Sequence, residues 1–139
     1  HPTNQRITTK TTTMKTLCYH TKWAELTNHV ILYFDDNPYG IPTGIIEVTT
    51  FHAGKRKGTA YIWNLHVDEQ CRRHGTGQHL LDTAISEAVK DGCHTAELEW
   101  SSLDSPEWVL RWYLRRGFTE AEFGKNNTLL RKELKQQTE

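Results

Sequence analysis

A change in hydrophobic periodicity near residue 67 limits most strongly the folds open to this chain. Before it, short turns separate three β-branched, apolar runs, at residues 29–34, 43–51 and 59–67. Runs joined this closely predict an antiparallel meander. After it, residues 78–90 carry apolar side chains at helical spacing, and Gly92 follows, which predicts an amphipathic helix. A chain that passes from paired strands to a strand–helix alternation is expected to form a mixed α/β (α+β) sheet.

The remaining segments complete this expected order. A short helix is predicted at residues 21–26, with Thr21 as its cap, and a second one that Ser105 caps and Pro106 begins, running to residue 116. Further strands are expected at residues 14–19, 95–100, 118–123 and 128–134. Residues 1–13 are polar and Thr-rich, and we interpret them as a tail or an edge strand before one domain at 14–139.

Composition excludes several classes of protein. The 139 residues carry 17 basic and 17 acidic side chains, so the net charge is zero, which argues against a nucleic-acid partner. Apolar runs are too short for a membrane helix, and no membrane partner is expected. The three cysteines form no C-x-x-C pair, and the first residues show no signal-peptide pattern, so a cytoplasmic location is expected. No metal-ligand spacing stands out, and no metal is predicted.

The junction between the last meander strand and the first long helix is the most informative segment. Residues 67–78 (VDEQCRRHGTGQ) place two glycines and two adjacent arginines at a helix entrance. Backbone N–H groups at a helix start, close to glycines, favour a bound anion, so the segment fits a phosphate or pyrophosphate site. A plain strand-to-helix turn with solvated arginines fits equally well on local physics. The Walker A and dinucleotide-binding patterns are both absent.

Two motifs resemble the GNAT superfamily of N-acetyltransferases. Residues 72–77 (RRHGTG) are similar to its [RQ]-x-x-G-x-[GA] signature, and residues 112–118 (WYLRRGF) are similar to a run that its members carry in the next helix. The resemblance covers roughly residues 43–134. It departs at Pro106 and Val109, where members commonly have Asn and Ala. It implies a single domain with a mostly antiparallel sheet flanked by helices, and here a shortened N-terminal helical region.

The resemblance also implies roles for particular residues. Acetyl-CoA would be the co-substrate, and the segments that would hold it comprise Leu65, His66, Val67, Arg72, Arg73, His74, Gly75, Thr76, Gly77 and Gln78. Backbone groups at 65–67 would pair with the pantetheine arm, and Arg72 would orient the loop. Tyr113 would protonate the departing thiolate, with a core aromatic as the alternative. The general base stays open among Glu99, His66, Asn64, Asp68, Glu69 and a water chain.

The acceptor is constrained only by charge. Four acidic residues are expected near the amine entrance: Glu97, Glu99, Asp104 and Glu107. They favour a small-molecule or peptide amine. The short N-terminal region predicts an acceptor pocket that is open or is completed by a second chain in a homodimer. The main hypothesis is an acetyl-CoA-dependent N-acetyltransferase with direct transfer, and the alternative is a catalytically silent acyl-CoA-binding or interaction module. Trp63, Trp100, Trp108 and Trp112 are expected mainly in the core, with Trp108 alternatively at a pocket mouth.

Overall fold

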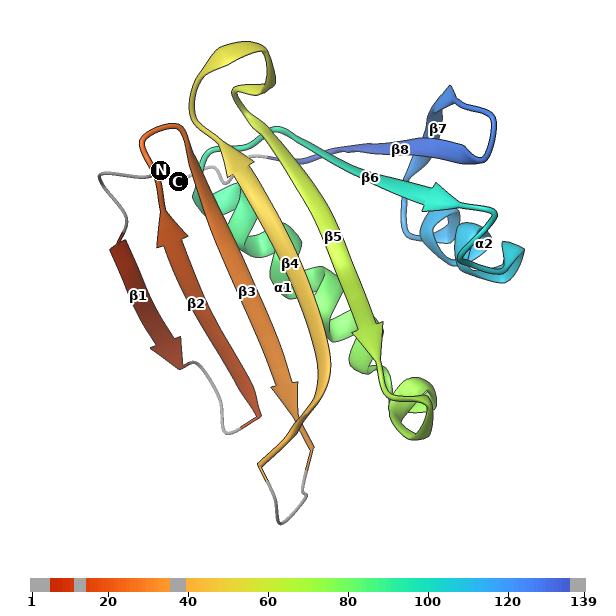
Figure 1. Cartoon of the computed structure of the whole chain (residues 1–139), viewed down its shortest axis with the longest axis horizontal. Helices are drawn as coiled ribbons and strands as arrows, with labels where there is room; N and C mark the ends of the chain where they lie inside the picture. Colours follow the sequence, from red (N-terminus) through yellow and green to blue (C-terminus); the bar gives the residue numbers. More distant parts are fainter. Residues whose placement is uncertain (1–5, 12–14, 36–39, 136–139) are drawn as a thin grey trace.

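A mixed β-sheet organises the described residues of this computed structural model, which are 6–11, 15–35 and 40–135 (Figure 1). Across this part of the chain eight strands lie in the order β1-β2-β3-β4-β5-β6-β8-β7. Their bounds are β1 Arg6–Thr11, β2 Thr16–Lys22, β3 Leu26–Phe34, β4 Pro42–Phe51, β5 Thr59–Val67, β6 Thr95–Ser101, β7 Thr119–Phe123 and β8 Asn127–Glu133. Neighbouring strands are antiparallel except β5 and β6, which are parallel. The expected α/β fold class is confirmed.

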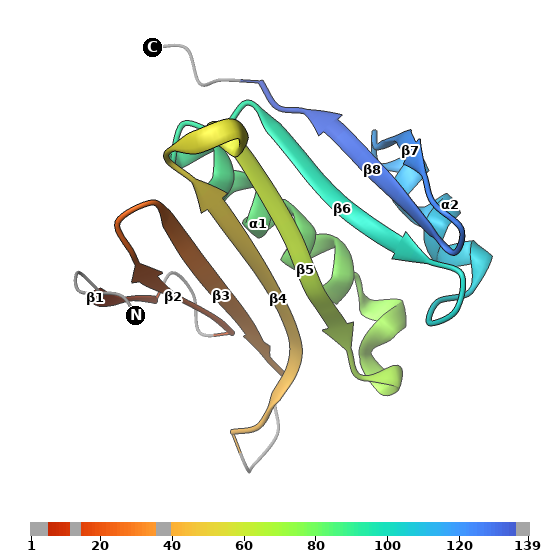
Figure 2. The ribbon, with the colours of Figure 1, turned by 45° about the horizontal axis from the view of Figure 1, so that its top comes forward.

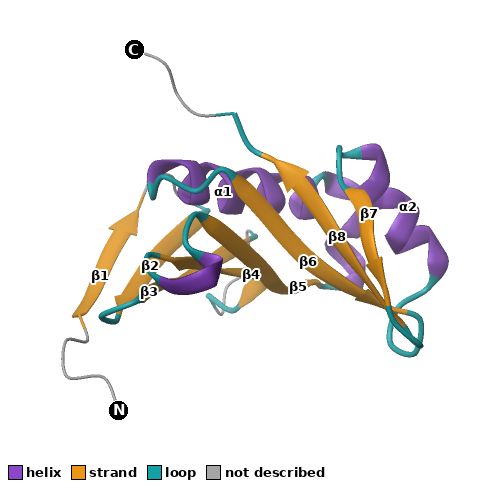
Figure 3. Cartoon of the chain, turned by 90° about the horizontal axis from the view of Figure 1, so that it is seen from above, coloured by secondary structure: helices purple, strands orange, loops and turns teal. Residues whose placement is uncertain are grey.

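Two α-helices lie on the same face of this sheet (Figure 3). They are α1 (Thr76–Lys90) and α2 (Glu107–Arg115), and short 3₁₀ turns form η1 (Gly54–Arg56) and η2 (Glu69–His74). Both helices follow β-strands and lead to parallel strands farther along the sheet, so right-handed crossovers place them on one side. In the described residues no α-helix precedes α1, which agrees with the predicted short N-terminal helical region.

The hydrophobic core lies between the helices and the covered face of the sheet. From α1, the side chains of Leu80, Leu81, Ala84 and Ala88 are fully buried. They meet the inward residues of β3, β4 and β5, which are Ile31, Ile46, Val48, Ala60 and Ile62. The period-2 and period-3.6 patterns of the sequence therefore meet in one apolar layer. In the described residues no helix is long and apolar enough to cross a membrane.

The predicted helix at residues 21–26 is wrong. Strand β2 continues to Lys22, and a tight turn follows in which the Trp23 N–H donates to the Leu26 carbonyl at 2.8 Å. Thr21 and Lys22 pair with Asn28 and Thr27 across this hairpin. A six-residue helix gains few intrahelical hydrogen bonds against its nucleation cost, so strand pairing prevails.

The predicted start of the second helix is also displaced. The helix begins at Glu107 and its N-cap is Pro106, in an extended conformation, with no side-chain capping hydrogen bond. Ser105 therefore does not cap it. The other predicted strands and helices match observed ones, with ends that differ by a few residues; Met14, the predicted start of the strand at 14–19, lies outside the described residues.

A β-bulge interrupts β5 at Asn64. Asn64 has a positive φ of 55°, and the register with β4 shifts between Ile45 and Glu47. Before the bulge Ala60 and Ile62 face the core, whereas after it Leu65 is half-buried and Val67 is buried. Strict alternation along 59–67 would place Tyr61, Trp63, Leu65 and Val67 on one face, but the extra residue at the bulge reverses the alternation.

The parallel strands β5 and β6 separate soon after they meet. Their pairing covers only Thr59–Tyr61 against Thr95–Glu97, and the two strands diverge beyond it (Figure 2). The rest of β5 therefore has no strand partner on its β6 side within the described residues. This opening, between a bulged strand and α2, is the setting of the candidate site.

Candidate active site

Two adjoining cavities occupy the opening between β5 and β6. The inner cavity, of about 280 Å³, lies between Ile62–Leu65 of β5 and Leu98–Ser101 of β6. The outer cavity, of about 400 Å³, reaches from Leu65–Val67 to the start of α1. The residues that line both cavities are Leu65, Asp104, Ser105, Val109 and Tyr113. A ligand could therefore run from the helix entrance into the opening between the strands.

Tyr113 stands where the two cavities meet. Its side chain is 9% exposed, and its ring packs edge-on against Trp112 and Phe118, with centroids 5.1 and 5.8 Å away. Burial raises the pKa of the Tyr113 phenol to about 12, so the group stays protonated at neutral pH. No residue of the described part donates to or accepts from Tyr113 Oη in a hydrogen bond. The phenol can therefore offer its proton to a molecule in the cavity.

The start of α1 presents donors to the outer cavity. Gly75, its N-cap, has a φ of 78° and no side chain with which to cap the helix. The first intrahelical bond runs from the His79 N–H to the Gly75 carbonyl at 3.0 Å, which leaves the N–H groups of residues 76–78 without helical acceptors. Such an end carries a partial positive charge and suits a phosphate.

Arg72 connects η2 to the end of β5. Its Nε donates to the Val67 carbonyl at 3.1 Å, and its side chain lines the outer cavity with His66 and Gly77. This contact sets the position of the loop between strand and helix. His74, Gly75 and Thr76 line a separate cavity of about 450 Å³. The Arg73 side chain lies outside the described side chains.

Arg116 is a residue that the sequence reasoning missed. Its Nε donates to Gln78 Oε1 at 2.6 Å, its Nη1 donates to the Trp112 carbonyl at 3.0 Å, and its guanidinium lies 3.9 Å from the Trp112 ring centroid. Arg116 thus joins the end of α2 to the first turn of α1. It belongs to the 112–118 motif, so the motif could have drawn attention to it.

The candidate bases lie in different parts of the site. Glu99 lines the inner cavity and accepts a hydrogen bond from Tyr61 Oη at 3.2 Å. Burial, and then the nearby Glu99 carboxylate, raise the pKa of Tyr61. His66 lines the outer cavity and is largely exposed, with its Nε2 3.9 Å from Asp68 Oδ1. Tyr113 shares a cavity with each of them.

Of the four acidic residues expected near the amine entrance, two form ion pairs and two line the cavities. Glu97 pairs with Arg131 at 2.8 Å and Glu107 with Arg111 at 3.2 Å, so both carboxylates are neutralised by neighbours. Asp104 and Glu99 are the acidic residues of this group that line the cavities. They are the remaining carboxylates of the group available to attract a cationic acceptor.

A polar network that the sequence did not suggest supports the bulge. Asn64 Nδ2 donates to Glu47 Oε2 at 2.8 Å, and Asn28 Nδ2 donates to Glu47 Oε1 at 3.0 Å. Asn64 lines the inner cavity, so this network ties the cavity wall to the centre of the sheet. An Asn within a strand pattern is itself a bulge signal, because Asn tolerates positive φ.

The prediction of a core position is wrong for Trp63, which is 40% exposed on the sheet face that lacks helices. Trp108 is 52% exposed and lines the outer cavity, which agrees with the alternative of a pocket mouth. Trp100 and Trp112 do pack against the core. Trp63 leaves the core because Tyr61 and Trp63 precede the bulge on the face opposite Ala60 and Ile62.

Comparison with known protein families agrees with this geometry. The model of the acetyltransferase (GNAT) family matches residues 5–118. The chain belongs to the GNAT acetyltransferase family. No curated protein matches the sequence significantly.

Solved GNAT structures share the fold. An acetyltransferase from Bacillus cereus is 23% identical, with a TM-score of 0.63, covering 78% of this chain and 74% of that one. A putative acetyltransferase from Agrobacterium tumefaciens is 28% identical, with a TM-score of 0.59 and coverage of 79% and 78%. A PaiA N-acetyltransferase from Thermoplasma acidophilum, solved in complex with coenzyme A, is 17% identical, with a TM-score of 0.62 and coverage of 78% and 61%.

Proposed function

We propose that this GNAT protein is an acetyl-CoA-dependent N-acetyltransferase that moves the acetyl group directly to a primary amine. The observation that carries the proposal is the pair of cavities that meet at Tyr113, with uncapped helix N–H groups at the outer end. The coenzyme A bound to the structural neighbour from Thermoplasma acidophilum supports the choice of co-substrate.

The outer cavity suits the pyrophosphate and the pantetheine arm of acetyl-CoA. The N–H groups of residues 76–78 would bind phosphate oxygens, and Arg72 would hold the loop in place. The arm would then lie along Leu65–Val67, on the side of β5 that has no strand partner in the described residues, and would add main-chain hydrogen bonds as a further strand does. This path delivers the thioester to the inner cavity.

Transfer begins when the amine nitrogen attacks the thioester carbonyl. An N–H group of the bulged part of β5 would stabilise the oxyanion, because strand pairing with β6 has already ended there. Collapse of the tetrahedral intermediate breaks the C–S bond, and Tyr113 would give its proton to the leaving sulfur. Its pKa of about 12 keeps it in the proton-bearing form throughout the physiological range.

The amine must lose a proton before or during attack, and two side chains could accept it. Glu99 sits in the inner cavity with Tyr113, and His66 in the outer one. Single-turnover rates of Glu99→Gln and His66→Gln, measured as a function of pH, distinguish the two. Only the variant that lacks the true base should lose the fall in rate at acidic pH that protonation of the base causes. The carboxylates of Glu99 and Asp104 favour a cationic acceptor, as a small molecule or a peptide amine.

Two matched glycine variants test the CoA site. Gly75 and Gly92 both have positive φ, 78° and 83°, and a Cβ added at either meets nothing within 4 Å. Alanine should therefore cost each position a similar amount, about 1–2 kcal/mol of folding free energy. Only Gly75→Ala should weaken CoA binding, by at least about tenfold in calorimetric titration, because only Gly75 borders the proposed phosphate donors. Equal CoA affinity in both variants, or no binding by the unmodified protein, would refute the site.

A silent acyl-CoA-binding module is the second candidate. The observation in its favour is the position of Pro106 and Val109 at the cavity, where family members commonly carry Asn and Ala. An amine panel that reads CoA thiol release separates the two functions. CoA binding without release for any amine would support the module.

A further inference from the structure

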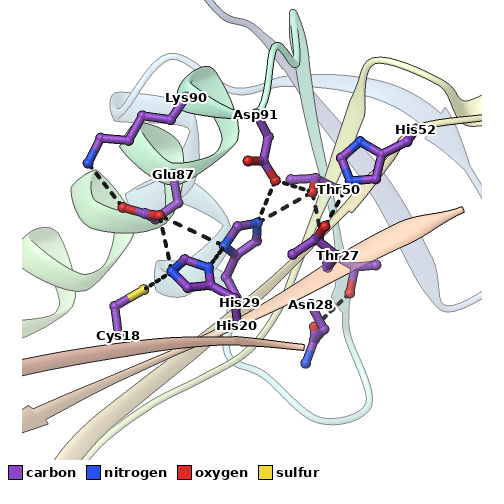
Figure 4. Close-up of polar contacts among 11 residues, drawn as sticks. Cys18, His20, Thr27, Asn28, His29, Thr50, His52, Glu87, Lys90 and Asp91 are labelled. Atoms are coloured by element: carbon purple, nitrogen blue, oxygen red, sulfur yellow. Dashed lines mark hydrogen bonds and ion pairs between the residues drawn. The ribbon is translucent and has the colours of Figure 1, made fainter. Parts of the chain in front are cut away.

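A buried cluster of metal-ligating side chains lies beneath the other end of α1 (Figure 4). Cys18 and His20 are two residues apart on β2, so both point to the covered face of the sheet. Glu87 reaches them from α1. The exposed fractions of the three residues are 3%, 5% and 5%.

The distances in this cluster are somewhat longer than those between ligands of one metal ion. Cys18 Sγ lies 3.8 Å from His20 Nε2, which lies 3.8 Å from Glu87 Oε1. The three ligand atoms are all within 4.8 Å of one another. Around tetrahedral Zn²⁺, with bonds of roughly 2.0–2.3 Å, neighbouring ligand atoms are about 3.3–3.6 Å apart. Small side-chain rotations would close the difference.

A second set of contacts orients His20 as a ligand. Asp91 Oδ2 accepts hydrogen bonds from Thr50 Oγ1 at 2.6 Å and from His29 Nε2 at 2.7 Å. In the tautomer of His29 whose single proton is on Nε2, Nδ1 is the acceptor, and His20 Nδ1, 2.5 Å away, is the donor. His20 then carries its lone pair on Nε2, the atom that faces Cys18 and Glu87. Metal-binding histidines commonly donate their other N–H to such a partner.

We propose that Cys18, His20 and Glu87 bind one Zn²⁺ ion, as a structural site separate from the acyl-transfer cavities. The soft thiolate and the imidazole favour Zn²⁺ over Mg²⁺ or Ca²⁺. Binding replaces the thiol proton of Cys18, which passes to the solvent, and leaves the charge of the metal balanced by one thiolate and one carboxylate. A water molecule or the second Glu87 oxygen, which now contacts Lys90 Nζ at 3.3 Å, completes the four-coordinate shell.

The site would fasten the N-terminal strands to the helix. Glu87 is eleven residues after Thr76, which places it about 16 Å along α1 from the proposed phosphate site. Strand β2 also contacts α1 nearer the start of the helix, where Thr16 Oγ1 lies 2.8 Å from His79 Nε2. The ion therefore acts on the N-terminal part of the sheet.

Cobalt binding tests the ligand set directly. Metal-free, untagged protein titrated with Co²⁺ should show a sulfur-to-cobalt charge-transfer band that saturates at one ion per chain. Cys18→Ala should abolish the band. Cys93→Ala is the matched control, because Cys93 is equally buried at 1% exposure but lies outside the ligand set, and Cys71→Ala tests the remaining thiol of the sequence. Absence of the band, or its loss in Cys93→Ala or Cys71→Ala instead, would overturn the proposal.

Stability supplies a readout that does not depend on cobalt or on activity. Zn²⁺ at about one hundred times its Kd should increase the folding equilibrium constant about 100-fold. Glu87→Gln keeps the size of the side chain, so it should fold, but should lose most of this increase. If Cys18→Ala does not fold, the test is the comparison of stabilisation by Zn²⁺ in Glu87→Gln and in Cys93→Ala. Equal stabilisation of these two proteins by Zn²⁺ would refute the site, whereas the transferase proposal would be unaffected.

Discussion

Replacing Tyr113 by Phe isolates the proposed proton donor from its packing. The ring of Phe keeps the edge-on contacts with Trp112 and Phe118, at 5.1 and 5.8 Å between centroids. Because Tyr113 Oη has no hydrogen bond to the described residues, its removal should change the free energy of unfolding by no more than about 0.5 kcal/mol. The variant should therefore be folded and should bind CoA as before.

The catalytic rate should respond quite differently. General acid catalysis contributes roughly 10²–10⁴-fold, or about 3–5 kcal/mol at 1.36 kcal/mol per tenfold change. The single-turnover rate of CoA thiol release, measured with enzyme in excess, should fall by that factor. Steady-state turnover is a poorer measure, since slow product release would hide the deficit.

The controls are a second tyrosine and the alkaline pH profile. Tyr19 is half-buried on β2, away from both cavities, so Tyr19→Phe should leave the single-turnover rate unchanged. The proton-bearing form of Tyr113 is lost only as pH rises through about 12, so Tyr113 should add no fall in rate between pH 7 and 10. An unchanged single-turnover rate in a folded Tyr113→Phe protein would refute the proton-donor role.

Two further predictions concern stability and reactivity. Burial alone would raise the pKa of Asp91, but hydrogen bonds from His29 and Thr50 lower it to about 2. A carboxyl group whose pKa is lower in the folded protein stabilises the fold at pH values above its unfolded pKa. After a discount for the partial exposure of Asp91, about 1–2 kcal/mol of the free energy of unfolding should be lost as pH falls from about 4 to about 2. Asp91→Asn should lack this loss in acid denaturation, and an identical profile in both proteins would contradict the assignment. Burial, and then the Asp91 charge, raise the pKa of the Cys93 thiol to about 11, so iodoacetamide should modify it in denatured but not in native protein at pH 8, as read by peptide mass spectrometry. Rapid native labelling of Cys93 would show that the core at this point opens.

Local sequence signals were sufficient for most of the fold. Apolar, β-branched runs between turn signals predicted β4 and β5, helical spacing predicted α1, and Gly75 and Gly77 marked the helix entrance. These signals work because each element buries one face against the same core. They failed at residues 21–26, where pairing of β2 with β3 decided the conformation.

The site was less predictable because it depends on distant residues. The separation of β5 from β6 follows from the bulge at Asn64 and from pairing that stops at Tyr61, and neither is encoded in one periodic segment. In the Cys18–His20–Glu87 cluster, Glu87 comes 67 positions after His20 and 69 after Cys18. Within the sequence, only Cys18 and His20 are close neighbours, and two such residues alone do not indicate a metal.

The short parallel ladder between β5 and β6 also affects the order of folding and the internal motion of the sheet. Thr59 and its partner Thr95 lie 36 positions apart, whereas only a few residues of sequence separate β1 from β2, β2 from β3 and β3 from β4. Pairing across a long loop carries the larger entropic cost, so the seam between β5 and β6 should be completed after the N-terminal hairpins. Three residue pairs are then the main backbone link between two half-sheets, and a ligand that spans the opening would restrain their relative motion. Amide hydrogen exchange in β6 and β8 should therefore slow when CoA binds, even though neither strand contributes to the proposed phosphate site.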